Sequence, residues 1–263
     1  MSQPTLTYSR YLKLDALLHL QQPLSDGPEH DETLFIIIHQ VYELWFKQLL
    51  HEVSALGPQL ARAQTLPALA TLRRVLTILK TLVAQVDVLE TMTPLSFGAF
   101  RTRLEAASGF QSAQFRALEF ALGAKRAAMM AAYAADDDAQ RMLQRWHAAP
   151  GLYDHFLAGL ALQGWPVPSA LLTRDVTSVY EGSPEVQMLL IDLYRRGDAV
   201  AQLCERLVDL DEGLQEWRYR HVKMVERTIG VKPGTGGSPG AAYLRETLFR
   251  PLFPDLWAIR SRF

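Results

Sequence analysis

Residues 30–56 read HDETLFIIIHQVYELWFKQLLHEVSAL and decide the fold class. Acidic residues open this segment, as they do at many helix N-termini, and apolar residues then recur at helical spacing until Gly57-Pro58, which is predicted to end the helix. Residues 66–92 repeat the pattern between a proline near the start and Thr93-Pro94 at the end. No segment alternates polar and apolar residues for long enough to indicate a sheet. We therefore predict an all-α fold, a bundle with long helices.

Two later segments are predicted as interrupted helices. Residues 96–107 are amphipathic and stop at Ser108-Gly109, after which residues 109–123 resume with Gly123 as the expected C-cap. The segment 183–230 is very long for one globular helix, so we expect it to bend or break near Gly197 and to run on to Gly230.

The rest of the sequence carries weaker signals for secondary structure. Residues 124–165 are rich in alanine and charge, which predicts exposed helices, with the acidic run 136–138 at a turn or a helix start. The glycine- and proline-rich segment 231–244 is not expected to be helical. Because no repeat of fixed period and no Pro/Ser-rich linker divides the chain, we predict a single domain over residues 1–263.

Composition narrows the possible partners. The 263 residues include 27 basic and 28 acidic side chains, which give a net charge of -1. A balanced charge provides no general attraction for nucleic acid or an anionic membrane, so we expect a small-molecule or protein partner. The one cysteine, Cys204, permits neither an internal disulfide nor a thiolate metal cluster, and a reducing cytoplasm is expected. No secretory signal or membrane span is found.

Two of the seven histidines stand on patterned helix faces. His39 follows Phe35 by four residues in an apolar run, and His221 follows Trp217 by four. A hydrogen-bonded core histidine and a surface histidine remain open alternatives for these two positions. Among metal sites, neither the Glu-x-x-His pairs of di-iron bundles nor H-E-x-x-H is present. A non-covalent haem needs only one strong protein ligand, so haem is permitted without being required.

Two further features could belong to a binding site. The loop GTGGSPG, residues 234–240, has no lysine after its last glycine and no preceding strand, which argues against a phosphate-binding P-loop. It is either a flexible connector or a lid over a ligand. Arg101 follows Phe97 at helical spacing close to a Ser-Gly break, and it is either exposed or placed to bind a carboxylate through two hydrogen bonds.

Four blocks of sequence, taken together, resemble the tryptophan 2,3-dioxygenase family, and they occur in the family's order. The resemblance covers essentially the whole chain, is strongest at 8–56, 89–123 and 217–245, and is weak from about 124 to 180. The blocks are YSRYLKLDALLHLQ, HDETLFIIIHQVYELWFKQLL, VLETMTPLSFGAFRTRLEAASGFQSAQFRALEFALG and WRYRHVKMVERTIGVKPGTGGSPGAAYLR.

This resemblance implies haem b, bound non-covalently and ferrous in the active form. His221 then matches the proximal iron ligand, with Trp217 in the cofactor site. His39 matches the distal histidine that meets the indole N–H and is the expected catalytic residue. The implied reaction inserts O2 across the indole C2–C3 bond of L-tryptophan and gives N-formylkynurenine, the first step of tryptophan catabolism through kynurenine. Rival readings are a same-fold dioxygenase for a modified indole, a non-catalytic haem or O2 sensor, and a helical scaffold with no cofactor.

Substrate contacts follow from the same resemblance. Phe35 and Phe97 match the aromatic walls, Arg101 the arginine that binds the carboxylate, Thr235 the residue that holds the ammonium group, and Ser108 a serine on the distal side of the haem.

The N-terminal segment 1–25 is implied to contact a neighbouring subunit. Tyr8 and Tyr11 match positions that reach into that neighbour's active site, so the expected assembly is a homotetramer, a dimer of dimers. Pro239 stands where the family more usually has serine, and it removes one backbone N–H from the glycine loop.

Overall fold

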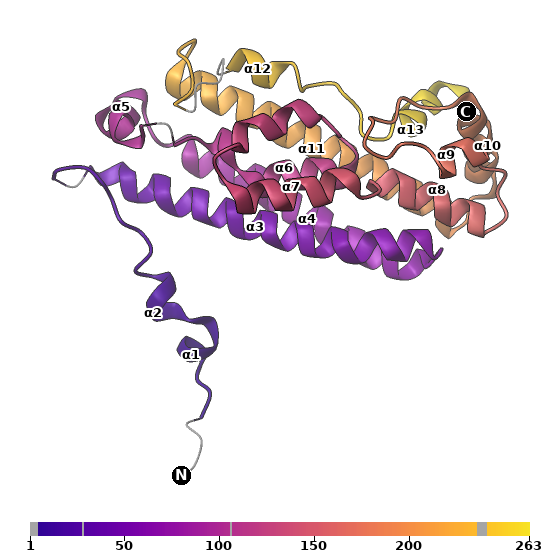
Figure 1. The fold of residues 1–263 in the computed structure, drawn as a ribbon, viewed down its shortest axis with the longest axis horizontal. Coiled ribbons are helices and arrows are strands. Elements are labelled where there is room, and N and C mark those ends of the chain that lie inside the picture. The colour runs from indigo at the N-terminus through magenta and orange to yellow at the C-terminus, as the bar shows by residue number, and fades with distance from the viewer. Residues whose placement is uncertain (1–4, 28, 106, 236–240) are drawn as a thin grey trace.

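Three long helices form the frame of the molecule in a computed structural model that describes residues 5–27, 29–105, 107–235 and 241–263. They are α3 (His30–Ala61), α4 (Thr65–Leu89) and α11 (Ala199–Ile229), with α4 packed against both of the others (Figure 1). Acidic residues in its first turn favour the start of α3, and the Asp198 side chain caps α11 by accepting from Val200 N and Ala201 N. No strand occurs in these described ranges, so the all-α prediction is confirmed.

The predicted end of the first long helix is wrong, because α3 runs through Gly57-Pro58 to Ala61. Leu56 and Leu60 on either side of the proline are 0% and 3% exposed. Burying two leucines is worth roughly 3–6 kcal/mol, which offsets the ~3 kcal/mol cost of an interior proline. Gly57 also lets α8 (Leu152–Leu162) approach closely, since a Cβ there would lie 2.8 Å from His155 Cδ2.

Shorter elements complete the bundle. Gly123 caps the end of α6 at φ 113°, Gly197 separates α10 from α11 at φ 66°, and Asp136 caps α7 through Ala139 N, so these three predictions are confirmed. The elements are α5 (Pro94–Phe100), η1 (Arg101–Leu104), η2 (Gly109–Gln111), α6 (Ala113–Leu122), η3 (Ala127–Tyr133), α7 (Asp137–Ala148), α9 (Ser169–Leu172), α10 (Pro184–Arg196), α12 (Ala241–Arg245), α13 (Pro254–Ala258) and η4 (Arg260–Arg262).

Two predictions about these elements are wrong. The helix α8 is not exposed: Leu152, Phe156 and Leu160 are buried in the core against α3. The periodicity of so short a helix does not reveal which of its faces other helices cover. The glycine-rich segment was expected to lack helix throughout, yet its last residues begin α12, because the run Ala241–Arg245 contains no glycine or proline. Pro239 lies outside the described residues.

Buried carboxylates fix the C-terminal segment to the body. Asp211 on α11 is fully buried and accepts from Leu252 N (2.8 Å), Phe253 N (3.2 Å) and Trp257 Nε1 (2.9 Å). Asp255, also fully buried, accepts from Tyr180 Oη and other donors. Burial raises the pKa of Asp211 even though these hydrogen bonds favour its charged form. The segment after α12 is therefore held against α10 and α11.

The N-terminal segment extends away from this body (Figure 1). Its two short helices, α1 (Tyr8–Leu12) and α2 (Leu14–Leu17), contain no buried residue. The C-terminal end of the segment is anchored to the body, because Leu24 N donates to the buried Glu32 carboxylate on α3 at 2.7 Å. Within the described residues, no helix is both long and apolar enough to cross a membrane.

Candidate active site

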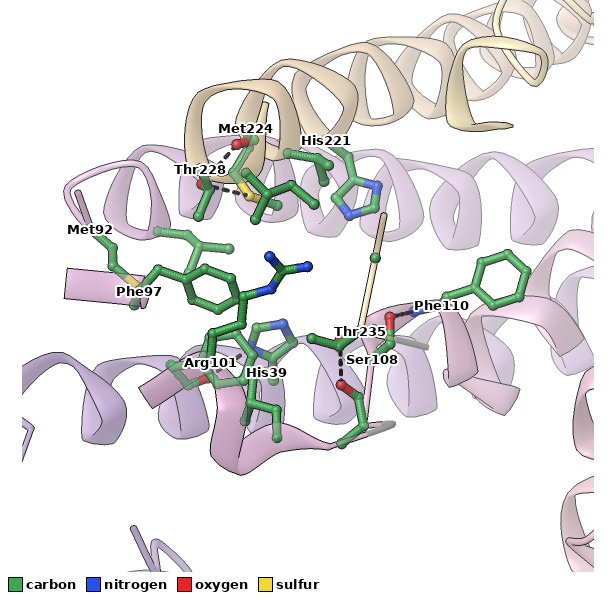
Figure 2. A pocket seen from close by; sticks show the side chains of 18 of the residues that line it. His39, Met92, Phe97, Arg101, Ser108, Phe110, His221, Met224, Thr228 and Thr235 are labelled. Atoms are coloured by element: carbon green, nitrogen blue, oxygen red, sulfur yellow. Dashed lines mark hydrogen bonds between the residues drawn. The ribbon is translucent and has the colours of Figure 1, made fainter. Parts of the chain in front are cut away.

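Two adjoining cavities lie between α3 and α11, with volumes of about 140 and 110 Å³; the α5–η1 segment lines the first of them and α6 lines the second. His39, His221, Gly109 and Phe110 line both of them. Figure 2 shows the His39 and His221 rings on helices that face each other across this space. We call the cavity that contains Arg101 the first cavity and the one that contains Trp217 the second. The two predicted histidines are thus brought together from positions 182 residues apart, the difference between 221 and 39.

Geometry defines the protonation of His39. Its Nδ1 lies 2.7 Å from the carbonyl oxygen of Phe35, one helical turn earlier. A carbonyl can only accept, so Nδ1 carries the proton and Nε2 of the neutral ring has a free lone pair. Burial lowers the pKa of His39, although that hydrogen bond and the charge of Glu43 oppose the shift. At neutral pH, therefore, His39 offers the cavity a hydrogen-bond acceptor.

Aromatic rings surround the His39 side of the first cavity. Phe35 lies 4.1 Å from His39 and 5.8 Å from Phe97, measured between ring centroids. Phe100, which is fully buried, lies edge-on to both phenylalanines at 5.5 and 5.4 Å. Such packing fixes the ring positions and leaves an apolar wall suited to a flat aromatic ligand.

Polar groups enter the first cavity from short segments. Arg101, at the start of η1, donates from Nη2 to the Pro233 carbonyl (2.5 Å), and Figure 2 shows its guanidinium directed into the space between the helices. Thr235 Oγ1 donates to the Ala107 carbonyl (2.6 Å). Ser108 lines the same cavity, and its hydroxyl accepts from Phe110 N as the N-cap of η2. The five predicted groups Phe35, Phe97, Arg101, Ser108 and Thr235 therefore share one cavity with His39.

His221 supplies a neutral imidazole opposite His39. Burial and the nearby His39 lower its pKa to about 4, so its ring is uncharged at neutral pH. The ring stacks on Trp217 at 5.1 Å with an interplanar angle of 17°. Within the described residues, no protein group hydrogen-bonds to the His221 ring, and no cluster of three or more metal-ligating side chains occurs. A metal group here would have to bring most of its own ligands.

The second cavity contains a buried ion cluster that sequence reasoning missed. Glu119 on α6, 2% exposed, accepts from Arg218 Nη2 (2.7 Å), Arg126 Nη2 (3.2 Å) and Arg116. Burial alone would raise the pKa of Glu119, but the three guanidinium groups outweigh it and lower that pKa. Arg116 Nε and Trp217 Nε1 are buried and find no hydrogen-bond partner in the part of the chain that the structure describes. The cluster thus presents excess positive charge and unused donors beside the cavity.

Other lining residues could have been found from helix periodicity. Met224 and Thr228 lie three and seven residues after His221 on the same face of α11. In contrast, nothing in the sequence links Glu119 to Arg218, since the pair is 99 residues apart.

Tyr8 and Tyr11 do not reach the cavity of their own chain. They lie on α1 in the extended N-terminal segment, with exposed fractions of 74% and 70%. Their predicted place in a neighbouring subunit's site stays a prediction.

Comparison with known proteins identifies the family. Residues 1–161 and 180–263 match the family model for tryptophan 2,3-dioxygenase. The chain belongs to the tryptophan 2,3-dioxygenase family. The matched residues include 124–161, so the family likeness extends further into the middle of the chain than the four sequence blocks indicated. Residues 162–179, which belong to the region of weak resemblance from about 124 to 180, lie outside the match.

Relatives carrying that name match over nearly their whole length. The chain is 61% identical to tryptophan 2,3-dioxygenase of Herpetosiphon aurantiacus over 99% of both chains. It is 59% identical to the enzyme of Anaeromyxobacter dehalogenans over 97% of this chain and 96% of that one. For the enzyme of Caulobacter vibrioides the identity is 46% over 98% of both. These matches support an oxidoreductase of tryptophan catabolism, as the four blocks implied.

Proposed function

We propose that this chain holds haem b on His221 and uses it to insert both atoms of O2 across the C2–C3 bond of L-tryptophan, giving N-formylkynurenine. The observation that carries this proposal is the pairing of two partly buried, neutral histidines across a cavity that also contains Arg101 and Thr235. A haem or O2 sensor would need His221 but would have no use for a carboxylate-binding and an ammonium-binding group in the same cavity.

The residues of the second cavity fit a haem. His221 has a lone pair and no hydrogen-bond partner among the described residues, and the porphyrin supplies the other four nitrogens. Arg116, with its unpartnered Nε, and the neighbouring Arg218 suit the two haem carboxylates. Trp217 packs beside His221 and limits the orientations its ring can take. Ferrous haem, when bound, supplies the redox chemistry that allows O2 to react with the indole.

The protein's own contribution is to orient the substrate. Arg101 binds the carboxylate, because within the described ranges only its Nη2 donates to a protein group, at Pro233, and its other donors remain. Thr235 Oγ1 accepts from the ammonium group, since its own proton is used on the Ala107 carbonyl. Phe35 and Phe97 confine the indole ring. Fixing the reacting groups in this way can lower a barrier by roughly 7–11 kcal/mol in the best cases.

His39 orients the indole N–H. Because its Nδ1 is protonated and bonded to Phe35, its Nε2 accepts the indole proton in a hydrogen bond. The indole proton is far too weakly acidic for a neutral imidazole with a lowered pKa to remove it outright. We therefore assign His39 as a hydrogen-bond acceptor that places C2 and C3, rather than as an obligatory base.

We further propose a homotetramer, a dimer of dimers, in which each N-terminal segment covers a neighbour's active site. Leu6, Tyr8, Tyr11 and Leu18 are each about 70% exposed, which is unusual for apolar side chains so close together. Size-exclusion chromatography with light scattering measures the assembly directly. Removal of residues 1–20 should weaken it and raise the KM for tryptophan, and an unchanged tetramer with unchanged kinetics would contradict this role.

A cytoplasmic location is part of the same proposal. The single cysteine, Cys204, is free and buried, which suits a reducing compartment.

Product formation tests the proposed function. Purified protein should show a Soret band, and after anaerobic reduction the addition of L-tryptophan and O2 should yield N-formylkynurenine absorbance. Tryptamine, which lacks the carboxylate, and indole-3-propionate, which lacks the ammonium group, are matched controls that should turn over far more slowly. Colourless protein, or a haem protein that leaves tryptophan intact, would rule the proposal out.

A further inference from the structure

A third cavity, of about 90 Å³, lies beside the ion cluster and is separate from the site described above. Arg126, Arg218 and Thr247 line both this third cavity and the second one, so they form the wall between the two. The other side of the third cavity is formed by Tyr180 and by Arg250 in the segment that follows α12. None of the residues predicted from the sequence as site residues contributes to it.

The lining of the third cavity carries positive charge only. Its charged side chains are Arg126, Arg218 and Arg250, and no aspartate or glutamate of the described residues lines it. Two nearby carboxylates are already engaged: Glu119 accepts from three guanidinium groups within the cluster, and Asp255 accepts from Tyr180 Oη. Arg218 is only 6% exposed, so its charge is poorly hydrated. A buried excess of positive charge is costly unless an anion compensates it.

Arg250 supplies unused hydrogen-bond donors. Its carbonyl accepts from Gln215 Nε2 at 2.7 Å, which fixes the backbone at this point. Its exposed guanidinium, however, makes no hydrogen bond or ion pair within the described part of the chain. The Tyr180 hydroxyl is already engaged with Asp255 at 2.5 Å, so Arg250 is the available donor on this side of the cavity.

The third cavity has room for a small ligand. A volume of about 90 Å³ holds several water-sized groups. That is enough for phosphate or a short carboxylate.

We propose that the third cavity binds a small oxyanion, phosphate or a short carboxylate, between Arg250 and the Arg126–Arg218 wall. Arg250 closes on the anion from the solvent side, while the wall provides charge from the buried side. The same guanidinium groups face the second cavity, so an anion here draws on the charge that faces the proposed haem carboxylates. The cavity does not depend on the proposed reaction, because neither His39 nor Arg101 contributes to it.

Calorimetric titration of the holoenzyme tests this proposal. Inorganic phosphate is added at constant ionic strength, with chloride as the balancing salt and saturating L-tryptophan present, so that the carboxylate site at Arg101 is occupied. We expect saturable binding of one phosphate per chain. Acetate, titrated in the same way, distinguishes a carboxylate ligand from phosphate. No saturable binding of either anion would overturn the proposal.

A pair of variants locates the binding. Arg250→Gln removes an exposed charge that pairs with none of the described residues, so the variant should fold normally and bind the anion at least about tenfold more weakly. Arg62→Gln removes an exposed arginine remote from the cavity lining and should bind as wild type does. As a second readout, phosphate should raise the Tm of wild type and Arg62→Gln much more than that of Arg250→Gln. Equal phosphate affinity in the two variants would disprove the site. Dioxygenase activity is measured separately and tests the proposed function.

Discussion

The first and second cavities share two histidines but are built from different kinds of structure. Polar groups of the first come from short segments: Arg101 from the start of a 3-10 turn, and Thr235 from the residues after α11. Those of the second come from helices, with Glu119 on α6 and Arg218 on α11, both nearly inaccessible. The first cavity can therefore change shape when short segments move, whereas a change in the shape of the second would disturb the core.

This difference matches what each cavity is proposed to hold. A substrate must enter and its product must leave on every turnover, which requires parts of low local stability. A cofactor should stay, which requires ligands fixed by packing. Hence substitutions in the first cavity should change substrate kinetics, and substitutions in the second should change haem retention. The following experiments, in order of decreasing effect, test that division.

His221→Ala should have the largest effect, because it removes the only proposed iron ligand from the protein. We expect complete loss of stable haem, measured as the ratio of Soret to 280 nm absorbance, with helical circular dichroism retained. His51→Ala, an exposed histidine on α3, is the control and should keep its haem. A fully haem-loaded His221→Ala protein with an unchanged spectrum would remove the ligand assignment.

Arg101→Ala should leave haem content unchanged and reduce kcat/KM for L-tryptophan by roughly 100-fold. The reason is the loss of charge-assisted hydrogen bonds to the carboxylate, which contribute ~1.5–3 kcal/mol of binding free energy when they are well oriented. Arg103→Ala, which removes an arginine bonded to Asp26 outside the cavity, is the matched control. Steady-state kinetics that do not change with Arg101→Ala would show that the carboxylate binds elsewhere.

His39→Ala should slow turnover about tenfold without abolishing it, and it should also change the pH profile. In wild type, protonation turns Nε2 from an acceptor into a donor, so affinity for tryptophan should fall as pH drops. Burial lowers the pKa of His39, so the neutral acceptor persists below the ordinary value and the fall begins only under pH 6.5. The variant should lack this acid limb. Complete inactivity with intact haem and substrate binding would instead indicate an obligatory base.

Arg116→Met should reverse the pattern of Arg101→Ala. Loss of the buried guanidinium should speed haem transfer to apomyoglobin roughly tenfold, while the KM for tryptophan stays near the wild-type value. Arg141→Met is the control, since Arg141 pairs with the exposed Asp138 on α7. If Arg116→Met altered KM and left haem transfer unchanged, the division between the cavities would be wrong.

The sequence predicts the long helices and the first cavity well, for identifiable reasons. Periodic apolar residues place α3 and α11, and the capping residues Gly123, Gly197 and Asp136 mark real helix ends. The family resemblance then selects His39 and Arg101 from among the other histidines and arginines, which spacing alone left open. Pro58 misleads because a local rule for helix ends is overruled by tertiary burial of Leu56 and Leu60.

The ion cluster and the third cavity could not be predicted, since they depend on long-range contacts. Glu119 meets Arg218 only because the fold brings α6 and α11 together at the second cavity. A single sequence contains no periodic signal for such a pair. Arg250, likewise, is recognisable as a binding residue only from its position beside Arg126 and Arg218.

Gly109→Ala should have the smallest effect and gives the finest test of the first cavity. Gly109 lies against His39, and an added Cβ would sit 3.9 Å from His39 Nε2, at ordinary van der Waals distance. The protein should therefore fold normally. Its Tm should lie within about two degrees of the wild-type value, as is usual for surface substitutions. The methyl group would occupy space beside the one nitrogen proposed to meet the indole N–H, so the KM for tryptophan should rise a few-fold with haem content unchanged. Gly98→Ala, at a glycine on α5 with open space around it, is the control and should leave the KM as it is. If Gly109→Ala bound tryptophan as tightly as wild type does, the indole nitrogen would approach His39 from another side, and the orienting role of Nε2 would have to be withdrawn.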